Sequence, residues 1–529
     1  MTYLIQHAVE HSAETLPEQD AFRFHGEGVS YAQLNRRANA LAAELVKRGV
    51  KPQDRVGIFM NKSLHLPVAV YGILKAGAAY VPLDPTSPVS RLDFILRDCN
   101  IRFLITQKNK LRVIRQVQDI ESRLDGLIGV EDAVDLDINV IPWKDIYAAA
   151  ADSAPTVRLM ERDLAYVMYT SGSTGKPKGI MHTHSSGLAY AKLSAALYDV
   201  KPGDKLANHS PLHFDMSTFE FFSGPLHGAT SVLIPEEYTR LPASLSKLLE
   251  DEGMTIWYSV TFALMQLLLR GVMEDRDLTS LRWVLFGGEP FPVKYLRELM
   301  QKLPNARFSN VYGPAEVNQC TFYHLPEVPD EDMVSVPLGE IWDNTSGLIV
   351  DEDDNEIETT EPGELVIRSA TMMRGYWGRP DLNETAFYIR KPFADYQEIF
   401  YRTGDLVQRA GDGSLLFLGR KDRQIKTRGY RVELDDVESA LLSHESIEEA
   451  AVYPVPDEEG TQFIEAGVTL KTEKITTVQE LIVYLKSKLP HYAIPRKLQI
   501  MDSFPRTGTG KIDRRTLRDL AIAESTKNE

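Results

Sequence analysis

The sequence predicts an α/β fold, with a large N-terminal α/β domain of several sheets and a small, mobile C-terminal α+β domain. Short apolar segments rich in β-forming residues alternate with helical patterns over most of the chain, which is typical of sheets covered by helices. The expected strands include residues 55–60, 103–106, 283–286 and 364–367, and the expected helices include residues 31–48, 64–75 and 244–252.

A domain boundary is expected near residues 418–423, where a strand ends and a densely charged segment begins. This predicts a large domain of residues 1–421 and a small domain of residues 422–529, and about 100 residues is a usual domain size. In the small domain we expect helices at 434–442 and 478–489 and strands at 450–455 and 463–470. The last dozen residues, which are mostly polar, are expected to fray.

The composition is that of a globular protein: 529 residues, 43% of them hydrophobic, with a net charge of −16. The acidic excess argues against nucleic acid or an anionic membrane as the main partner. The N-terminus lacks the pattern of a signal peptide, and no apolar run approaches the ~18 residues that span a bilayer. Because Cys99 and Cys320 show no metal-ligand or redox spacing, a cytoplasmic location is expected.

Residues 169–179, with the sequence YTSGSTGKPKG, form the most informative segment. Its Ser, Thr and Gly residues offer backbone N–H groups and hydroxyls with little bulk, and two lysines follow, which suits a polyphosphate. Pro177 stands where a P-loop requires Ser or Thr, so this is not that motif. A flexible linker is the alternative. However, residues 164–169 predict a buried strand that leads directly into the loop.

Three further segments have residue types that suit a nucleotide site, each with a structural alternative. Residues 310–316 combine an aromatic ring with a carboxylate suited to magnesium, or form a turn. Residues 401–406 place Asp405 where it can accept from both ribose hydroxyls, or form an Asx turn. Residues 506–514 form a glycine-hinged loop that delivers Lys511 to a centre of developing charge, or an exposed turn before a helix.

A basic cluster at residues 419–431 is followed at once by acidic residues at 433–438. This order favours a local salt-bridged face or an anion contact over a nucleic-acid surface.

From about residue 30 to 514 the chain resembles the adenylate-forming enzymes, and within them the stand-alone amino-acid adenylation domains of nonribosomal peptide synthetases. The motifs occur in the family's order and with its spacing. They are residues 74–84, 169–179, 214–217, 401–406, 419–438, 489–495 and 510–514. Residues 74–84 are typical of this branch rather than of fatty-acid or acetate ligases.

The resemblance implies a site for ATP, magnesium and an amino acid. The loop residues that would hold the ATP phosphates are Thr170, Ser171, Gly172, Ser173, Thr174, Gly175 and Lys178. The other residues of the ATP or AMP site would be Asn310, Tyr312, Gly313, Ala315, Asp405 and Arg420, with Tyr312 on the adenine and Asp405 and Arg420 at the ribose.

The resemblance also implies the catalytic groups. Glu316 would bind magnesium, and Lys511 would contact the substrate carboxylate and the ribose or bridging oxygens. Asp422 would be the hinge of the small domain, and Gly429 would line the tunnel of a phosphopantetheine arm. Two positions depart from the family pattern. Ala315 stands where the family usually has Thr, which is expected to weaken a contact to the AMP phosphate. Ser369-Ala370 stands where the family usually has a dipeptide that contains Gly.

Both reactants of such an enzyme are anions, so catalysis is expected to rest on positioning and charge neutralisation rather than on a protein nucleophile. A thiol would then attack the acyl-adenylate after the small domain rotates about Asp422.

Asp215 is expected to bind the α-ammonium group of the substrate. It lies in an aromatic, apolar stretch, where a buried carboxylate needs a cationic partner. The alternative is that it caps a helix from Ser217 onward. The resemblance places the rest of the pocket at Met216, Phe219, Tyr258, Leu285, Gly287, Val311, Gln319 and Cys320.

None of these pocket residues is charged except Asp215, which makes a charged substrate side chain an unfavourable choice. Several of them resemble the pockets of prolyl-carrier-protein ligases, so we expect L-proline or another small neutral amino acid. Gln319 departs from that pattern and offers a hydrogen bond to a polar substituent.

Only 15 residues follow Arg514, so we expect the thiol to come from a separate holo carrier protein. A D-alanine–carrier protein ligase has the same chemistry and is an alternative. An acyl-CoA ligase is disfavoured by Asp215. A non-catalytic nucleotide-binding module is disfavoured by the retention of Lys511, Glu316 and Asp405.

Overall fold

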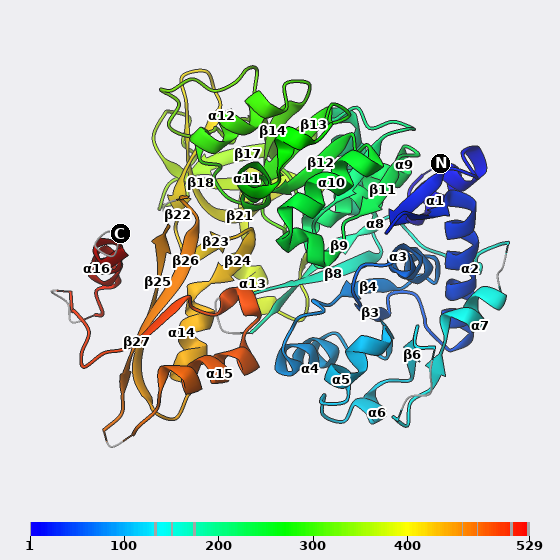
Figure 1. The fold of residues 1–529 in the computed structure, drawn as a ribbon, viewed down its shortest axis with the longest axis horizontal. Helices are drawn as coiled ribbons and strands as arrows, with labels where there is room; N and C mark the ends of the chain where they lie inside the picture. The colour runs from blue at the N-terminus through cyan, green and yellow to red at the C-terminus, as the bar shows by residue number, and fades with distance from the viewer. Residues whose placement is uncertain are drawn as a thin grey trace. The chain divides into compact units, whose positions relative to one another are not determined.

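The computed structural model describes residues 2–131, 135–149, 152–172, 176–457, 459–472, 474–507 and 511–525. The chain divides into two compact units. The first consists of Met1–Pro85, Leu96–Tyr169 and Gly179–Lys421, and the second consists of Thr86–Ile95, Thr170–Lys178 and Asp422–Glu529. Helices and sheets alternate along the chain in the first unit (Figure 1), which confirms the predicted α/β class.

The first unit contains a nine-stranded sheet, whose central strands β10, β12, β13 and β14 are parallel. In spatial order its strands are β16 (Glu340–Ile341), β15 (Thr321–His324), β14 (Arg307–Tyr312), β13 (Trp283–Gly287), β12 (Ile256–Val260), β10 (Lys205–Asn208), β11 (Thr230–Leu233), β1 (Asp20–Phe24) and β2 (Glu27–Ser30). Along the central strands, successive side chains point to opposite faces of the sheet, so they pack in two different hydrophobic cores. Trp257 and Val284 pack with α10 (Pro242–Glu252), α11 (Thr261–Arg270) and α12 (Val293–Lys302), which lie beside these strands in Figure 1.

An eight-stranded sheet forms the second large layer of this unit. In spatial order its strands are β19 (Gly375–Tyr376), β9 (Lys178–Thr183), β8 (Leu164–Thr170), β4 (Ala79–Pro82), β3 (Arg55–Phe59), β5 (Phe103–Thr106), β6 (Gly126–Ile128) and β7 (Val140–Ile141). Its core includes residues of α2 (Tyr31–Lys47) and α3 (His65–Lys75). The helix α2 begins after Ser30, because Ser30 and Gln33 form a capping box.

A five-stranded antiparallel sheet completes the first unit. Its strands are β17 (Thr345–Val350), β18 (Gly363–Ser369), β21 (Tyr396–Arg409), β20 (Phe387–Phe393) and β22 (Leu415–Arg420). The remaining α-helices before residue 421 are α1 (Gln6–Thr15), α4 (Val89–Asp98), α5 (Leu111–Ile114), α6 (Ile120–Arg123), α7 (Trp143–Ala148), α8 (His184–Leu197), α9 (Gly224–Leu226) and α13 (Pro380–Thr385). Short 3₁₀ or π turns are η1 (Lys108–Lys110), η2 (Asp215–Ser217), η3 (Phe219–Ser223), η4 (Glu236–Arg240) and η5 (Met273–Asp275), of which η3 is a π-helix.

The second unit has one hairpin and one three-stranded sheet. Its elements are β23 (Gln424–Thr427), β24 (Tyr430–Glu433), α14 (Leu434–Leu442), β25 (Ile447–Pro456), β26 (Gln462–Leu470), α15 (Val478–Lys488), η6 (His491–Ala493), β27 (Lys497–Ile500) and α16 (Arg514–Ser525). Both turn residues of the β23–β24 hairpin have positive φ, +52° at Arg428 and +81° at Gly429, as a type I′ turn requires. The expectation that the last dozen residues fray is wrong for residues up to Ser525, because they form α16, whose Leu517 and Ala521 pack in a small core.

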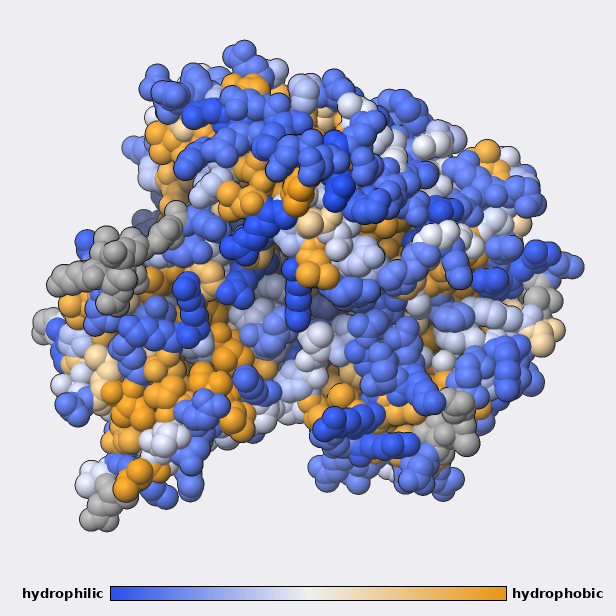
Figure 2. Space-filling view, in the orientation of Figure 1, coloured by the Kyte–Doolittle hydropathy of each residue, from blue (hydrophilic) through white to orange (hydrophobic). Residues whose placement is uncertain are grey.

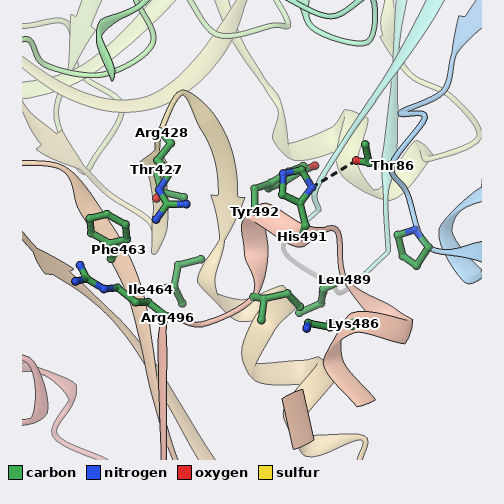
Figure 3. Close-up of a pocket in the computed structure, with 12 residues that line it drawn as sticks. Thr86, Thr427, Arg428, Phe463, Ile464, Lys486, Leu489, His491, Tyr492 and Arg496 are labelled. Atoms are coloured by element: carbon green, nitrogen blue, oxygen red, sulfur yellow. Dashed lines mark hydrogen bonds between the residues drawn. The ribbon is translucent and has the colours of Figure 1, made fainter. Parts of the chain in front are cut away.

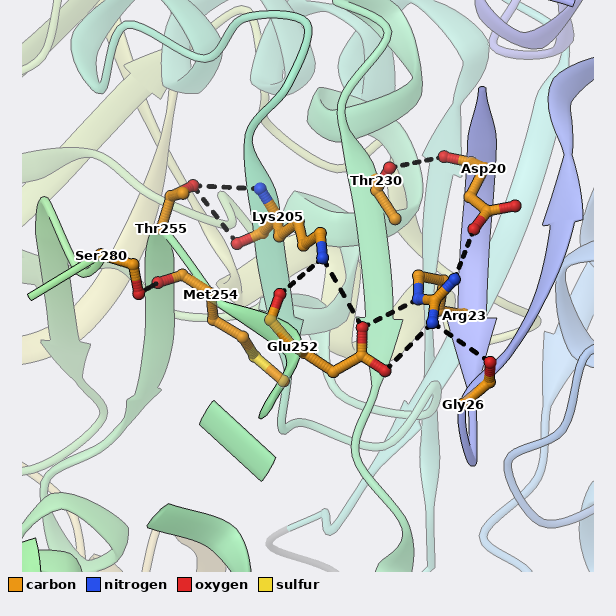
Figure 4. Close-up of polar contacts among 9 residues, drawn as sticks. All are labelled: Asp20, Arg23, Gly26, Lys205, Thr230, Glu252, Met254, Thr255 and Ser280. Atoms are coloured by element: carbon orange, nitrogen blue, oxygen red, sulfur yellow. Dashed lines mark hydrogen bonds and ion pairs between the residues drawn. The ribbon is translucent and has the colours of Figure 1, made fainter. Parts of the chain in front are cut away.

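A buried ion network ties two strands of the nine-stranded sheet to α10 (Figure 4). Glu252, the last residue of α10, accepts a hydrogen bond from Arg23 Nε at 2.8 Å, and its backbone carbonyl accepts one from Lys205 Nζ at 2.6 Å. Arg23 also pairs with Asp20 at 2.6 Å. Only 8% of the Glu252 side chain is exposed, so its charge depends on these partners.

The surface is mostly polar, with apolar patches over the part of the second unit around α14, α15 and β25 (Figure 2). Exposed apolar side chains of this unit include Ile475, Val483 and Leu520. In the part of the chain that the structure describes, no helix has the length and apolar character needed to cross a membrane.

Candidate active site

The predicted amino-acid pocket lies on one face of the nine-stranded sheet. Tyr258 of β12 is in register with Leu285 of β13, and Gly287 of β13 is in register with Val311 of β14. Because side chains alternate along a strand, these four residues face the same side. Tyr258, Leu285 and Val311 indeed share a core that also contains Phe219 and, at its edge, Met216. The structure therefore brings six of the predicted pocket residues together.

Gly287 has a steric reason to be glycine. A Cβ atom at this position would lie 2.2 Å from the carbonyl oxygen of Val311 on the neighbouring strand. Even alanine would require the two strands to move apart, so this position keeps the pocket floor close to the backbone.

Asp215 is the first residue of η2, and its surroundings differ from those predicted. It is half-buried rather than buried. It does not cap a helix, since Phe214 precedes η2 as the cap residue and no side-chain cap bond is formed. Burial, followed by the charge of the Asp215 carboxylate, raises the pKa of Tyr166 and Tyr258. A half-buried carboxylate thus lies close enough to the phenol groups of Tyr166 and Tyr258 to act on both.

The two remaining predicted pocket residues differ in position. The Nε2 atom of Gln319 donates to the Tyr198 hydroxyl at 3.2 Å, whereas its Oε1 atom is buried without a partner among the described residues. Cys320 packs in the neighbouring core, with Tyr312 and Tyr401. Gln319 therefore contacts Tyr198, which belongs to the same core as Tyr258 and Leu285. Cys320 does not belong to that core.

The predicted adenine and ribose residues contact one another. The Tyr312 hydroxyl donates to Oδ2 of Asp405 at 2.5 Å, and Arg420 Nη1 pairs with Oδ1 of the same carboxylate at 2.5 Å. Asp405 and Arg420 are in register across β21 and β22. Asp405 is 4% exposed, so the charge of Arg420 offsets the cost of burying it.

Hydrogen bonds between side chains and backbone carbonyls hold the end of β14 and the loop that follows it. Asn310 Nδ2 donates to the carbonyl of Pro337 at 2.7 Å, and the carbonyl of Ala315 lies 3.0 Å from Nε2 of His182. A Cβ atom on Gly313 would lie 2.1 Å from the carbonyl oxygen of Asn318. This close packing explains the glycine and holds the loop against the sheet.

Two described residues of the phosphate loop bond to the second unit, to which Thr170–Lys178 belongs by its contacts. The Ser171 hydroxyl donates to the carbonyl of Arg431 at 3.1 Å, and the Gly172 N–H donates to Oδ2 of Asp436 at 3.2 Å. A carboxylate oxygen thus accepts from a backbone donor predicted to bind phosphate. The predicted residues Ser173, Thr174 and Gly175 lie outside the described residues, whereas Lys178 begins β9.

The predicted residues of the second unit are at its surface. Asp422 is exposed, and its carboxylate accepts from the Gln424 N–H at 3.2 Å. Lys511 is exposed, and its carbonyl accepts from the Thr507 N–H at 2.8 Å. Part of the basic cluster forms the local salt-bridged face that its sequence favoured, because Arg423 pairs with Glu438 at 3.0 Å.

A cavity of about 500 Å³ lies in the second unit beside the β23–β24 hairpin (Figure 3). The guanidinium groups of Arg428 and Arg496 lie 4.5 and 4.6 Å from the centre of the Phe463 ring. Lys486 and His491 also line the cavity. Arg428, Arg496 and Lys486 thus place three cationic side chains around one cavity. In a chain with a net charge of −16, such a cluster is a local site for an anion.

Comparison with known proteins identifies the family. Residues 9–377 match the AMP-binding enzyme family, and residues 436–511 match the AMP-binding enzyme C-terminal domain. The chain belongs to the AMP-binding enzymes. It is an AMP-forming ligase that adenylates a substrate with ATP, as the resemblance predicted.

Relatives of this AMP-binding enzyme include stand-alone and multidomain proteins. It is 34% identical over 97% of its length to an L-proline–[L-prolyl-carrier protein] ligase of Pseudomonas fluorescens and covers 98% of that protein. It is also 34% identical over 97% of its length to tyrocidine synthase 1 of Brevibacillus parabrevis, of which it spans 44%, and it spans 10% of a linear gramicidin synthase from the same organism. Among solved structures, the amide bond synthetase McbA of Marinactinospora thermotolerans has the same fold, with a TM-score of 0.86 at 22% identity, covering 98% and 99% of the two chains.

Glu316 of this AMP-binding enzyme suits the predicted magnesium by its chemistry. Its carboxylate is fully buried and accepts a hydrogen bond from the Tyr376 hydroxyl at 2.7 Å. Among the described residues no three His, Cys, Asp or Glu side chains gather as a metal cluster. Magnesium at nucleotide sites commonly takes one or two carboxylates and completes its shell with phosphate oxygens and water, so a single carboxylate fits it.

Two residues near this site, Tyr190 and His182, were not predicted from the sequence. The Tyr190 hydroxyl of α8 is buried without a partner among the described residues, in the same core as Tyr258. His182, at the end of β9, stacks on Tyr166, and burial lowers its pKa to about 4. The sequence offered one indication of His182, namely that it follows a few residues after the predicted phosphate loop.

Proposed function

We propose that this enzyme activates a small neutral amino acid, with L-proline as the leading candidate, and transfers it to the phosphopantetheine thiol of a separate carrier protein. The observation that carries the proposal is that the charge of the Asp215 carboxylate acts on Tyr258, which belongs to a row of uncharged residues with Leu285 and Val311. An ammonium group is the natural partner of this carboxylate, whereas a fatty or aryl acid supplies none. The relative of Pseudomonas fluorescens, a prolyl-carrier protein ligase at 34% identity, supports the choice.

The bulky aromatic residues of the predicted pocket also favour a small substrate. Phe219, Tyr258 and Tyr190 belong to one buried core, in which Trp342 packs on Tyr190 with 6.0 Å between ring centres. Within the described part of the chain, the Tyr190 hydroxyl and the Oε1 atom of Gln319 are buried without a hydrogen-bond partner, so each could bond to a polar group of a substrate.

In the first step an oxygen of the substrate carboxylate attacks the α-phosphorus of ATP. A P–O bond forms, the bond from this phosphorus to the bridging oxygen breaks, and pyrophosphate leaves. Tyr312, Asp405 and Arg420 would hold the nucleoside, the loop of residues 170–178 would hold the departing phosphates, and Lys511 would neutralise charge on the reacting oxygens. Magnesium held by Glu316 and phosphate oxygens would supply further neutralisation of charge.

In the second step the thiol loses its proton to solvent and its sulfur attacks the acyl carbon. A C–S bond forms and the C–O bond to AMP breaks. Rotation of the small domain about Asp422 would withdraw Lys511 and bring Gly429 to the entering arm. The cationic cavity beside the β23–β24 hairpin suits a phosphate ester, which both coenzyme A and the arm of a carrier protein carry.

The alternatives share part of this chemistry. A D-alanine–carrier protein ligase would use the same residues with another amino acid. An acyl-CoA ligase would use the same cationic cavity but has no use for Asp215.

The test is an incubation of the protein with ATP, an amino acid, and either free coenzyme A or a holo carrier protein. We expect an aminoacyl thioester on the carrier protein with proline and none on coenzyme A. Efficient thioester formation with D-alanine would favour the second function. Acylation of coenzyme A by an acid that lacks an amine would refute the proposal.

A further inference from the structure

Lys62 buries its ammonium group at the end of a strand in the neighbouring sheet. It follows β3 of the eight-stranded sheet, yet its Nζ atom donates to the carbonyl of Asn208, the last residue of β10 in the nine-stranded sheet, at 2.7 Å and to that of His209 at 2.9 Å. Its backbone N–H donates to Glu236 at 2.7 Å. Only 6% of Lys62 is exposed, and a buried ammonium is retained where several acceptors compensate for lost water.

Asn208 connects this lysine to a second buried charge-bearing group. Its Nδ2 atom donates to Oε2 of Glu220 at 3.0 Å, and its carbonyl accepts from the Ile234 N–H as well as from Lys62. Glu220 is 1% exposed, and its own carbonyl accepts from the Ser231 hydroxyl at 2.7 Å. Lys62, Asn208 and Glu220 thus form one continuous polar chain between the two sheets, which we call the brace.

The brace holds both ends of the segment that carries the proposed amino-acid site. Asp215, Met216 and Phe219 all lie between Asn208 and Glu220. Within this segment regular structure is limited to the 3₁₀ turn η2 and the start of the π-helix η3. Short turns fix a backbone less firmly than a longer helix, and π-helical turns occur frequently at functional sites. The anchors at the two ends therefore largely decide where Asp215 lies.

We propose that Lys62 and Glu220 are positioning residues for the amino-acid substrate, acting through Asn208 on the segment that presents Asp215. This inference rests on the proposed function. Neither side chain is placed in contact with the substrate, so their effect should appear in the use of the amino acid and not in the use of ATP.

The pKa shifts of Lys62 and Glu220 predict which substitution of Glu220 is tolerated. Burial lowers the pKa of Lys62 and raises that of Glu220, each to about 8. The raised pKa favours the neutral form of Glu220, so we expect Glu220 to serve as a hydrogen-bond partner of Asn208 rather than as a counter-ion of Lys62. Glutamine has the same shape and also accepts from the Asn208 amide, whereas alanine does not.

The experiment measures amino-acid-dependent pyrophosphate exchange for Lys62→Met, Glu220→Ala and Glu220→Gln. We expect the first two to raise the KM for the amino acid about tenfold, while kcat and the KM for ATP stay within about twofold. Glu220→Gln should behave like the unsubstituted protein. If Lys62→Met does not fold, Lys62→Gln, which keeps an N–H donor, replaces it.

The matched control is Lys75→Met. Lys75 is also a buried lysine, but its ammonium pairs with Glu10 of α1, and the pKa of Lys75 is likewise lowered by burial. Its loss should lower stability and leave both KM values unchanged. Equal rises of the KM for ATP and for the amino acid in the brace variants would overturn the proposal, as would a Glu220→Gln variant as impaired as Glu220→Ala. Absence of exchange with every amino acid in the unsubstituted protein would instead refute the proposed function.

Discussion

At the scale of single residues, Asp215 decides the class of substrate. Asp215→Asn keeps the shape of the side chain and removes its charge, so an ammonium group loses its partner. We expect kcat/KM for the amino acid to fall about 100-fold, since breaking a partly desolvated charge pair costs a few kcal/mol. Steady-state pyrophosphate exchange measures this, with Asp199→Asn, which removes an exposed ion pair with Lys201, as the control. An unchanged kcat/KM would show that Asp215 binds no ammonium.

Glu220 gives a prediction about pH. Burial raises its pKa from 4.5 to about 8, so the folded protein holds a proton that the unfolded chain has released. This group therefore contributes stability that is fully present below about pH 4.5 and is lost as the pH rises through about 8.

Urea unfolding of the unsubstituted protein and of Glu220→Gln at pH 5, 6.5 and 8 measures this effect. We expect the unsubstituted protein to lose stability relative to the variant as the pH rises. Parallel profiles of the two proteins would mean that Glu220 is ionised in the folded state at neutral pH.

The two acidic residues also show what sequence reveals at this scale. Asp215 was found because a carboxylate in an aromatic stretch is unusual and the family motif names it. Glu220 stands five residues later in the same stretch, but its proposed role depends on Asn208 of β10 and on Lys62, which follows β3 of the other sheet. The half-exposure of Asp215 was missed for the same reason, since it depends on how distant segments pack.

At the scale of secondary-structure elements, the ion network at the end of α10 is expected to hold that helix to the sheet. Glu252→Gln removes the partner of Arg23 in a buried setting, so we expect a loss of about 2 kcal/mol in the free energy of unfolding. The neighbouring Asp251→Asn removes only an exposed pair with Lys247 and should change it by less than about 0.5 kcal/mol. Urea unfolding compares the two variants, and equal effects would contradict a stabilising network.

Regular elements were largely predictable, because they follow hydrophobic periodicity. The predicted strand 103–106 agrees with β5, and the predicted helix 31–48 ends one residue beyond α2 at Lys47. The π-helix η3 was not predicted. The Glu220 carbonyl accepts from the Ser231 hydroxyl and the Ser223 hydroxyl bonds to that of Ser194, contacts with distant segments that a local sequence pattern does not show. The irregular elements η2 and η3 carry Asp215, Met216 and Phe219, whereas Tyr258, Leu285 and Val311 lie on regular strands.

At the scale of the whole molecule, the two half-reactions are expected to use Lys511 differently. Lys511→Ala should abolish pyrophosphate exchange, because charge on the reacting oxygens is no longer neutralised. It should spare transfer to the thiol from supplied aminoacyl-AMP. Rates of the two half-reactions measured separately test this, and an equal loss in both would contradict the assignment of two conformations.

Membership of the two compact units does not follow the order of residues along the chain. The segments Thr86–Ile95 and Thr170–Lys178 lie early in the sequence but belong by their contacts to the unit of Asp422–Glu529. Contacts between segments so far apart in the chain leave no periodic pattern in the sequence from which they could be predicted. The fold class was predictable because it depends on the alternation of strands and helices, which the sequence contains.

The central claim is that this AMP-binding enzyme activates a small neutral amino acid. Its most direct test is ATP–pyrophosphate exchange with a panel of all amino acids, including D-alanine, and of acids that lack an amine. We expect exchange with L-proline or a close neutral analogue and none with acids that lack the amine. Strong preference for a charged side chain, or equal exchange with an acid lacking an amine, would contradict it.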